Sequence, residues 1–339
     1  MVRIAWLLPE NPAPELLESR EKRRGGLPPG TEIISVRHDE PVPRTDDIRA
    51  VCWVPPTKPQ RLLDFLDANP RVEWVHSFSA GVDGLSSVIK DRLRDSPIVL
   101  TNGRGAFSSS LAEYAIAAMF HFNKQFSRCE ENRRKRKWDK FTMDTVGGST
   151  MGFVGFGDIA KSTAALAAPL GLNLVALRRN PSKASAEEAR SGPDDAKYVL
   201  KATYGPDDAS AFYAQCDFVV CSLPLTEETR ASISDEAFAS MKPSAVFISL
   251  GRGAVIDEAA LYKALSTRQI AGAACDVFAK EPLPDDSPLW TCDNLLLTAH
   301  NADFTPDYFD LGHATWHENL KRFLKEEPMA TPVDKASGY

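Results

Sequence analysis

Residues 152–160, which read GFVGFGDIA, constrain the fold of this chain more than any other feature. Gly155, Gly157 and Ala160 occupy the small positions of a G-x-G-x-x-A pattern. The first glycine permits a tight turn, the second lets backbone approach a diphosphate, and the third small residue lets a helix pack closely on a strand. An apolar strand precedes the pattern and a helix is expected over Ile159–Leu170. We therefore predict a dinucleotide-binding turn with the diphosphate at the helix N-terminus; a glycine-rich turn without ligand is the alternative.

The residues after the next predicted strand bear on the choice of dinucleotide. Strand Asn173–Leu177 is followed by Arg178 and Arg179. NAD-binding turns carry an acidic residue about 20 positions past the glycines, which hydrogen-bonds the ribose 2′-hydroxyl. Here two guanidinium groups stand instead, and they can bind a 2′-phosphate in bidentate fashion. We predict that NADP(H) is preferred and NAD(H) possible; the alternative is a solvated loop with accidental charge.

Short apolar runs alternate with helical patterns along the chain, which predicts parallel sheets covered by helices. In the first part the expected strands are Arg3–Leu8, Glu32–Val36, Ala50–Val54, Trp74–Ser77 and Ile98–Thr101, with helices near Pro14–Arg23 and Gln60–Ala68. After a helix over Ser108–Lys124, the expected strands are Gly152–Phe156, Asn173–Leu177, Asp217–Ser222, Ala245–Leu250, Ala271–Ala274 and Leu295–Thr298. Further helices are expected over Glu258–Leu265 and Pro306–Lys325.

A chain of 339 residues exceeds what one hydrophobic core usually organises. We expect an α/β fold of two doubly wound domains, Rossmann-like or flavodoxin-like, with a cleft between them. The dinucleotide-binding domain would span residues 105–303. It would be inserted into an outer, substrate-binding domain made of residues 1–104 and 304–339.

Two segments do not fit this alternation. Residues 178–204 are polar and rich in Ser, Ala and Pro, which favours a loop with a weak helix. Residues 131–140 read ENRRKRKWDK and hold five consecutive basic residues at 133–137. A nuclear or nucleic-acid address is one interpretation of that run. A solvated charged loop is the other, and it fits the acidic remainder of the chain better.

Composition excludes several classes of partner. The formal net charge of −6 disfavours non-specific binding to nucleic acid or to an anionic membrane. The six cysteines form no CxxC pair and no metal-ligand spacing, so we expect reduced thiols, a cytoplasmic location and no metal site. The N-terminal run Val2–Leu8 lacks the layout of a secretory signal. The longest apolar stretch, Leu111–Phe122, is too short to span a bilayer.

Three ionisable residues follow predicted strands in the second half of the chain: Arg252, Glu281 and His300. The carboxyl ends of such strands form the ligand-binding edge of an open α/β sheet. Arg252 can hold the carboxylate of a keto acid and polarise its carbonyl group. The imidazolium of His300 can protonate the new alkoxide as hydride arrives, and Glu281 would favour and orient that charged imidazole. Singly, each residue also fits a structural role; together they favour catalysis.

Eight segments of the chain resemble one enzyme family. They are VEWVHSFSAGVDGL (72–85), SLAEYAIAAMFHFNK (110–124), GFVGFGDIA (152–160), CDFVVCSLPLTEETR (216–230), MKPSAVFISLGRGAVIDEAAL (241–261), AGAACDVFAKEPLPDDSPLW (271–290), LLLTAH (295–300) and VDKASGY (333–339). With them the chain resembles the D-isomer-specific 2-hydroxyacid dehydrogenases, close to the glyoxylate/hydroxypyruvate reductase branch. The resemblance covers nearly the whole length.

The resemblance implies roles for individual residues. Arg252, Glu281 and His300 match the family's Arg–Glu–His catalytic set, and Asp276 matches the acceptor for the nicotinamide carboxamide. Backbone N–H groups at Ser79, Ala80 and Gly81 would bind the substrate carboxylate with Arg252 and His300. The expected cofactor-binding residues are Gly155, Phe156, Gly157, Asp158, Ile159, Arg178, Arg179, Ser222, Leu223, Pro224, Thr229, Leu250, Gly251 and Asp276. A homodimer joined through the cofactor domain is also implied.

The substrate implied is a short 2-keto acid such as glyoxylate or hydroxypyruvate, reduced to the D-2-hydroxy acid. Asp303 departs from the pattern, because many relatives carry a small apolar residue or glycine after the histidine, and this leaves the substrate open. Longer or aromatic 2-keto acids are an alternative, with Phe78, Trp290 and Phe304 either lining a larger pocket or serving as core. A dinucleotide-sensing, corepressor-like interaction protein on the same fold, with residues 133–137 as its partner surface, is the other alternative.

Overall fold

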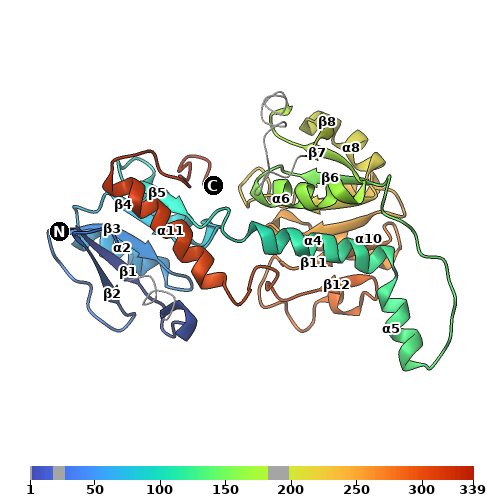
Figure 1. Ribbon diagram of the computed structural model, residues 1–339, viewed down its shortest axis with the longest axis horizontal. Coiled ribbons are helices and arrows are strands. Elements are labelled where there is room, and N and C mark those ends of the chain that lie inside the picture. The colour runs from blue at the N-terminus through green and yellow to red at the C-terminus, as the bar shows by residue number, and fades with distance from the viewer. Residues whose placement is uncertain (1, 18–26, 182–197) are drawn as a thin grey trace. The chain divides into compact units, whose positions relative to one another are not determined.

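The computed structural model describes residues 2–17, 27–181 and 198–339. Within them the chain forms two compact units. Unit 1 contains residues 1–107 and 306–339, and unit 2 contains residues 108–305. Each unit is built on its own parallel sheet (Figure 1).

The sheet of unit 1 has the strand order β2-β1-β3-β4-β5, which is the flavodoxin-like order. Its strands are β1 (Val2–Leu7), β2 (Thr31–Val36), β3 (Ile48–Trp53), β4 (Trp74–Ser77) and β5 (Val99–Asn102). Successive side chains of a strand point to opposite faces. Along β1, therefore, Ala5 and Leu7 pack with α2 (Pro59–Ala68), whereas Ile4 and Trp6 pack with α11 (Tyr308–Leu324).

The sheet of unit 2 has the order β12-β11-β10-β9-β6-β7-β8, with all neighbours parallel. Its strands are β6 (Thr150–Val154), β7 (Asn173–Leu177), β8 (Leu200–Tyr204), β9 (Phe218–Cys221), β10 (Val246–Ser249), β11 (Gly272–Cys275) and β12 (Leu295–Leu297). The order reverses between β6 and β9. In such sheets ligands bind at this switch point, outside the carboxyl ends of the strands.

Helices cover both faces of the second sheet. On one face α4 (Ser108–Asn123) and α6 (Asp158–Ala167) lie side by side (Figure 1) and share a core with Val220 and Ile248. On the other face α8 (Ala209–Gln215), α9 (Asp235–Ala239) and α10 (Glu258–Ser266) share a core with Val219 and Phe247. The expectation of two doubly wound α/β domains is confirmed.

Two local predictions are wrong. Leu200–Tyr204 form β8, a strand at the edge of the sheet paired with β7, where a loop with a weak helix was expected. Residues 131–134 complete α5 (Phe126–Arg134) instead of belonging to a loop. The predicted helix over 14–23 lies partly outside the described residues, and so do residues 182–197.

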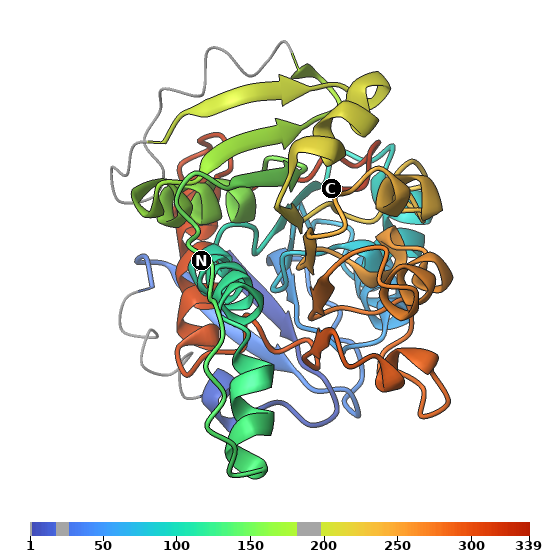
Figure 2. The same ribbon diagram turned by 90° about the vertical axis from the view of Figure 1, so that its right-hand side faces the viewer.

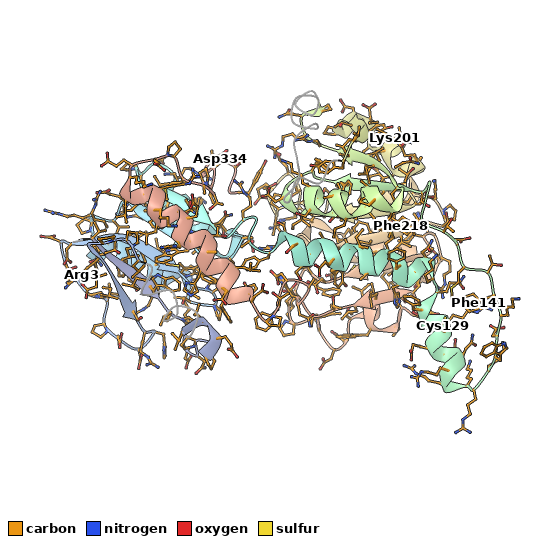
Figure 3. The ribbon with its side chains drawn as sticks, viewed as in Figure 1. Arg3, Cys129, Phe141, Lys201, Phe218 and Asp334 are labelled. Carbon is orange, nitrogen blue, oxygen red and sulfur yellow. The ribbon has the colours of Figure 1, made fainter. Side chains whose placement is uncertain are left out.

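Helix α5 stands away from the sheet of unit 2 in both views (Figures 1 and 2). None of its residues is buried. The chain returns to the sheet past Trp138, which is 99% exposed, and Phe141, whose ring faces the Arg128 guanidinium at 4.1 Å. Figure 3 shows Cys129 on α5 and Phe141 on this returning segment.

Candidate functional site

The glycine turn lies between β6 and α6, as expected. Gly155 adopts φ +80°, a conformation that disfavours residues with a Cβ, and its N–H bonds the carbonyl of Leu177 at 3.0 Å. A Cβ on Gly157 would meet no atom within 4 Å, so the space in front of this backbone is open. Asp158 and Ile159 begin α6, whose first N–H groups point toward that space. The turn therefore presents open backbone at a helix N-terminus.

Arg178 and Arg179 follow β7 at the same edge of the sheet. The Arg178 guanidinium lies 5.8 Å from the centre of the Phe156 ring, next to the second glycine of the turn. Arg179 Nη2 is 2.7 Å from Glu228 Oε2, an ion pair between two exposed side chains. Two cations thus stand where an adenosine ribose would lie in a dinucleotide-binding unit.

The loops after β9 and β10 pack directly against each other. Gly251 has no room for a side chain, because its Cβ would lie 2.4 Å from the carbonyl oxygen of Leu223. Thr229 Oγ1 donates to the carbonyl of Pro224 at 2.6 Å and shapes the first loop. The structure thus brings together a further set of the residues expected to bind cofactor: Ser222, Leu223, Pro224, Thr229, Leu250 and Gly251.

These residues fit a bound dinucleotide on structural grounds. The hydroxyl oxygens of Ser222 and Ser249, at the ends of β9 and β10, are buried and have no hydrogen-bond partner among the described residues. Buried polar groups are normally paired. Together with the open backbone at Gly157, they form an edge with unfilled hydrogen-bonding capacity at the switch point of the sheet.

Glu281 and His300 form a direct pair. His300 Nδ1 is 2.7 Å from Glu281 Oε2, while Glu281 Oε1 accepts from the N–H of Phe278 at 2.9 Å. His300 itself adopts φ +52°, an uncommon conformation for a residue with a Cβ. A carboxylate that is itself held by the backbone fixes the orientation of the imidazole ring.

Asp276 organises the backbone around His300. Its buried carboxylate accepts from Thr298 Oγ1 at 2.6 Å and from the N–H groups of Asn301 and Ala302, both at 3.1 Å. Its carbonyl accepts from the N–H of His300 at 2.8 Å. A carboxylate offers about four acceptor positions, so three are filled and one is left.

Sequence reasoning missed the residues that support this loop from α4. Tyr114 Oη lies 2.8 Å from Thr298 Oγ1, and Ser110 Oγ donates to the carbonyl of Ala302 at 2.5 Å. Because Thr298 donates to Asp276, Tyr114 must donate to Thr298. Burial raises the pKa of Tyr114 to about 12, which keeps that proton in place. The helical period of α4 was visible in the sequence, but which polar residues face the loop depends on packing.

Arg252 begins the turn after β10, and its Nη1 donates to the carbonyl of Gly251 at 3.0 Å. Asp303, in the segment that follows His300, interacts electrostatically with both Arg252 and His300. Burial raises the pKa of the Asp303 carboxyl, whereas the charges of His300 and Arg252 lower it. One edge of unit 2 therefore holds a guanidinium, an imidazole–carboxylate pair and a second carboxylate.

The remaining predicted substrate-binding residues, Ser79, Ala80 and Gly81, belong to unit 1 and follow β4. Asn102 Nδ2 donates to the carbonyl oxygen of Ala80 at 2.6 Å. The N–H of Gly103 donates to the carbonyl oxygen of Ser79 at 3.0 Å. In the described part of the chain no group accepts from the backbone N–H groups of these three residues. Phe78 is core, 2% exposed, whereas Trp290 and Phe304 are exposed.

The described ranges contain no cluster of metal-ligating residues and no helix suited to crossing a membrane. No group of three or more His, Cys, Asp or Glu residues is placed there to hold a metal ion. None of the helices described has both the length and the apolar character needed to cross a bilayer. The glycine turn and the neighbouring loops of unit 2 can bind a dinucleotide. At the same edge of the sheet, His300 can transfer a proton and Arg252 provides a positive charge.

Comparison with protein families agrees with this geometry. The model of the D-isomer specific 2-hydroxyacid dehydrogenase NAD binding domain matches residues 116–302, more than half of the chain. Glyoxylate/hydroxypyruvate reductase B of Pectobacterium carotovorum is 33% identical over 248 residues, which are 71% of this chain and 72% of the relative. Glyoxylate reductase of Korarchaeum cryptofilum is 30% identical over 273 residues, 78% of this chain and 76% of the relative.

Solved structures show the same architecture. A D-isomer specific 2-hydroxyacid dehydrogenase from Xanthobacter autotrophicus, crystallised with NADPH and MES, superposes with a TM-score of 0.81 at 26% identity. The match covers 100% of this chain and 99% of that one.

Proposed function

Because the chain belongs to the D-isomer specific 2-hydroxyacid dehydrogenase family, we propose that it reduces a short 2-keto acid to the D-2-hydroxy acid with NADPH. The hydrogen-bonded pair of His300 and Glu281, on the edge that also bears Arg252, is the observation that carries this proposal. Glyoxylate and hydroxypyruvate are the proposed substrates.

The catalytic roles follow from the chemistry of the side chains. Arg252 holds the substrate carboxylate and polarises the keto oxygen. His300, oriented by Glu281, gives its proton to that oxygen. The bound dinucleotide supplies the hydride. Ser79, Ala80 and Gly81 of unit 1 are the further residues proposed to offer backbone N–H groups to the substrate carboxylate.

The cofactor is held by the residues of the glycine turn and the neighbouring loops. The N-terminus of α6 accommodates the diphosphate, and the remaining acceptor position of Asp276 suits the nicotinamide carboxamide. Arg178, set against the Phe156 ring, and Arg179 bind the ribose 2′-phosphate. This last contact is the reason for proposing NADPH over NADH.

Binding measurements test the cofactor choice directly. We expect NADPH to bind at least tenfold more tightly than NADH, and the double variant Arg178→Ala/Arg179→Ala to lose that difference, since charge-assisted hydrogen bonds contribute about 1.5–3 kcal/mol each. Arg268→Ala, which changes an exposed arginine paired with Asp293, is the matched control. Dissociation constants for NADH and NADPH equal within about threefold would contradict the assignment.

A substrate panel tests the reaction. Purified protein is mixed with NADPH or NADH and a series of 2-keto acids, and loss of reduced nicotinamide is followed together with the configuration of the product. We expect turnover of glyoxylate or hydroxypyruvate and, where the product is chiral, the D-isomer. Silence across the panel would favour a dinucleotide-sensing protein of the same fold.

We also propose a homodimer in the cytoplasm. Exposed apolar side chains gather on α5 and the segment returning from it, namely Phe126, Trp138 and Met143. Exposed apolar surface of this kind supports an interface. The basic residues beside it are partly neutralised by their own carboxylates, as in the pairs Arg133–Glu130 and Lys135–Glu131. All six cysteines are free thiols, which supports a reducing compartment.

A further inference from the structure

Helix α4 presents two hydroxyl groups to the segment that carries His300. Ser110 and Tyr114 are four residues apart, so they lie on the same face of the helix. Ser110 Oγ donates to the carbonyl oxygen of Ala302 at 2.5 Å, and Tyr114 Oη lies 2.8 Å from Thr298 Oγ1. Thr298 precedes the histidine by two residues and Ala302 follows it by two. One face of α4 therefore holds the segment on both sides of the histidine.

The two residues that α4 contacts are also the ones that Asp276 binds. Thr298 Oγ1 donates to Asp276 Oδ1 at 2.6 Å, and the N–H of Ala302 donates to Asp276 Oδ2 at 3.1 Å. Because a hydroxyl group has one proton, Thr298 gives that proton to Asp276 and accepts from Tyr114. Linked hydrogen bonds of this kind strengthen one another. Loss of a contact from α4 therefore weakens the hold of Asp276 on the same segment.

His300 depends on this support more than an ordinary residue would. Its φ of +52° is uncommon for a residue with a Cβ and must be maintained by the surrounding contacts. Its pair with Glu281 orients the ring, but the position of the ring also follows the backbone. A general acid must lie within hydrogen-bond reach of the oxygen that it protonates. A displacement of about 1 Å can lower the rate about 100-fold.

We propose that Ser110 and Tyr114 are positioning residues for the proton transfer. They act through Thr298 and Ala302, which keep His300 where its imidazole can reach the keto oxygen. This inference rests on the proposed function. Neither hydroxyl is itself the acid. Burial raises the pKa of Tyr114 to about 12, and its proton is already shared with Thr298.

The test measures the single-turnover rate of hydride transfer from NADPH to hydroxypyruvate in Ser110→Ala and Tyr114→Phe, together with the dissociation constant of NADPH. Each variant removes one hydroxyl and keeps the rest of the side chain. We expect each to slow the transfer about threefold to tenfold, as for the loss of one uncharged hydrogen bond, with NADPH affinity within about twofold of the wild type. Ser110→Thr keeps the hydroxyl and should restore most of the rate.

Two matched variants serve as controls. Ser109→Ala changes an exposed serine on the same helix, and Tyr262→Phe removes a phenol from the half-buried tyrosine of α10. Both should transfer hydride at the wild-type rate. If Tyr114→Phe fails to fold, Ser110→Ala and Ser110→Thr make the same comparison.

The decisive measurement repeats Ser110→Ala and Tyr114→Phe in the background of His300→Asn. Residues that act through the histidine should lower the remaining rate less than about twofold there. The full loss in that background would overturn the inference, and so would an unchanged rate when both hydroxyls are removed from the wild type. Weaker NADPH binding with an unchanged rate would also overturn it. A wild type that reduces no 2-keto acid would refute the proposed function as well, whereas the other outcomes leave that function standing.

Discussion

At the scale of single residues, the site depends on how the backbone around His300 is held. The left-handed conformation of His300 is uncommon for a residue with a Cβ. Four hydrogen bonds to Asp276 hold this segment in place, three at its carboxylate and one at its carbonyl. Asp276 therefore acts on catalysis by positioning the histidine, in addition to the cofactor contact proposed for it.

Replacing Asp276 tests this positioning role. Asp276→Ala leaves two backbone N–H groups and the Thr298 hydroxyl without their acceptor. We expect the free energy of unfolding to fall by about 2–5 kcal/mol and turnover to fall as His300 loses its orientation. Urea unfolding and steady-state rates measure both. Asp293→Ala, an exposed carboxylate paired with Arg268, should cost less than about 1 kcal/mol. Equal stability of the Asp276 variant and the wild type would contradict this account.

At the scale of elements, most of the fold could be predicted from the sequence, because the spacing of apolar residues along each element matches the faces that the element buries. Strand β10 is a continuous apolar run covered on both faces, and the glycine turn has one geometry that its small residues permit. Edge elements were harder. Strand β8 alternates apolar and polar residues over five positions only, and α5 is mostly polar and has no buried residue. Neither buries enough apolar surface to leave a clear pattern.

The candidate site also contains some residues that could be predicted from the sequence and others that could not. Arg252, Glu281 and His300 could be placed at strand ends because parallel strands bring their carboxyl ends to one edge. The hydroxyl groups of Tyr114 and Ser110 could not, because their contacts depend on how α4 lies across the sheet.

Strand β4 carries a buried histidine that makes the stability of unit 1 depend on pH. Burial, with a smaller contribution from the charge of His313, lowers the pKa of His76 to about 3. The unfolded chain takes up this proton near pH 6.5, so native stability falls as pH drops from about 6.5 toward 3. Above pH 6.5 both states are neutral and His76 has no effect.

We expect the free energy of unfolding of the wild type to fall by about 2 kcal/mol more than that of His76→Gln between pH 7 and pH 5. Urea unfolding at the two pH values measures the difference. His38→Gln, at an exposed histidine, should behave like the wild type. If the His76 variant shows the same pH dependence as the wild type, His76 is not the group responsible.

At the scale of the whole molecule, two units with different sheet orders share one chain, and the dinucleotide fingerprint and catalytic set lie in unit 2. Unit 2 also carries α5, a helix without buried residues. Such a helix gains little stability from packing within one copy. We therefore place the proposed dimer interface there.

Light scattering tests the dimer. We expect the wild type to have twice the mass of the chain, and Trp138→Asp to shift toward the monomer, because a fully exposed tryptophan can be changed without disturbing the fold of one copy. Val199→Asp, another exposed apolar position, is the control. A monomeric wild type would exclude the interface.

The most direct test of the central claim is a single-turnover measurement on His300→Asn with NADPH and hydroxypyruvate. We predict that NADPH binds within about twofold of its wild-type affinity while the rate of hydride transfer falls by about 10²–10⁴-fold, the usual contribution of a positioned general acid. An unchanged rate of hydride transfer in this variant would contradict the assignment of His300 as the proton donor.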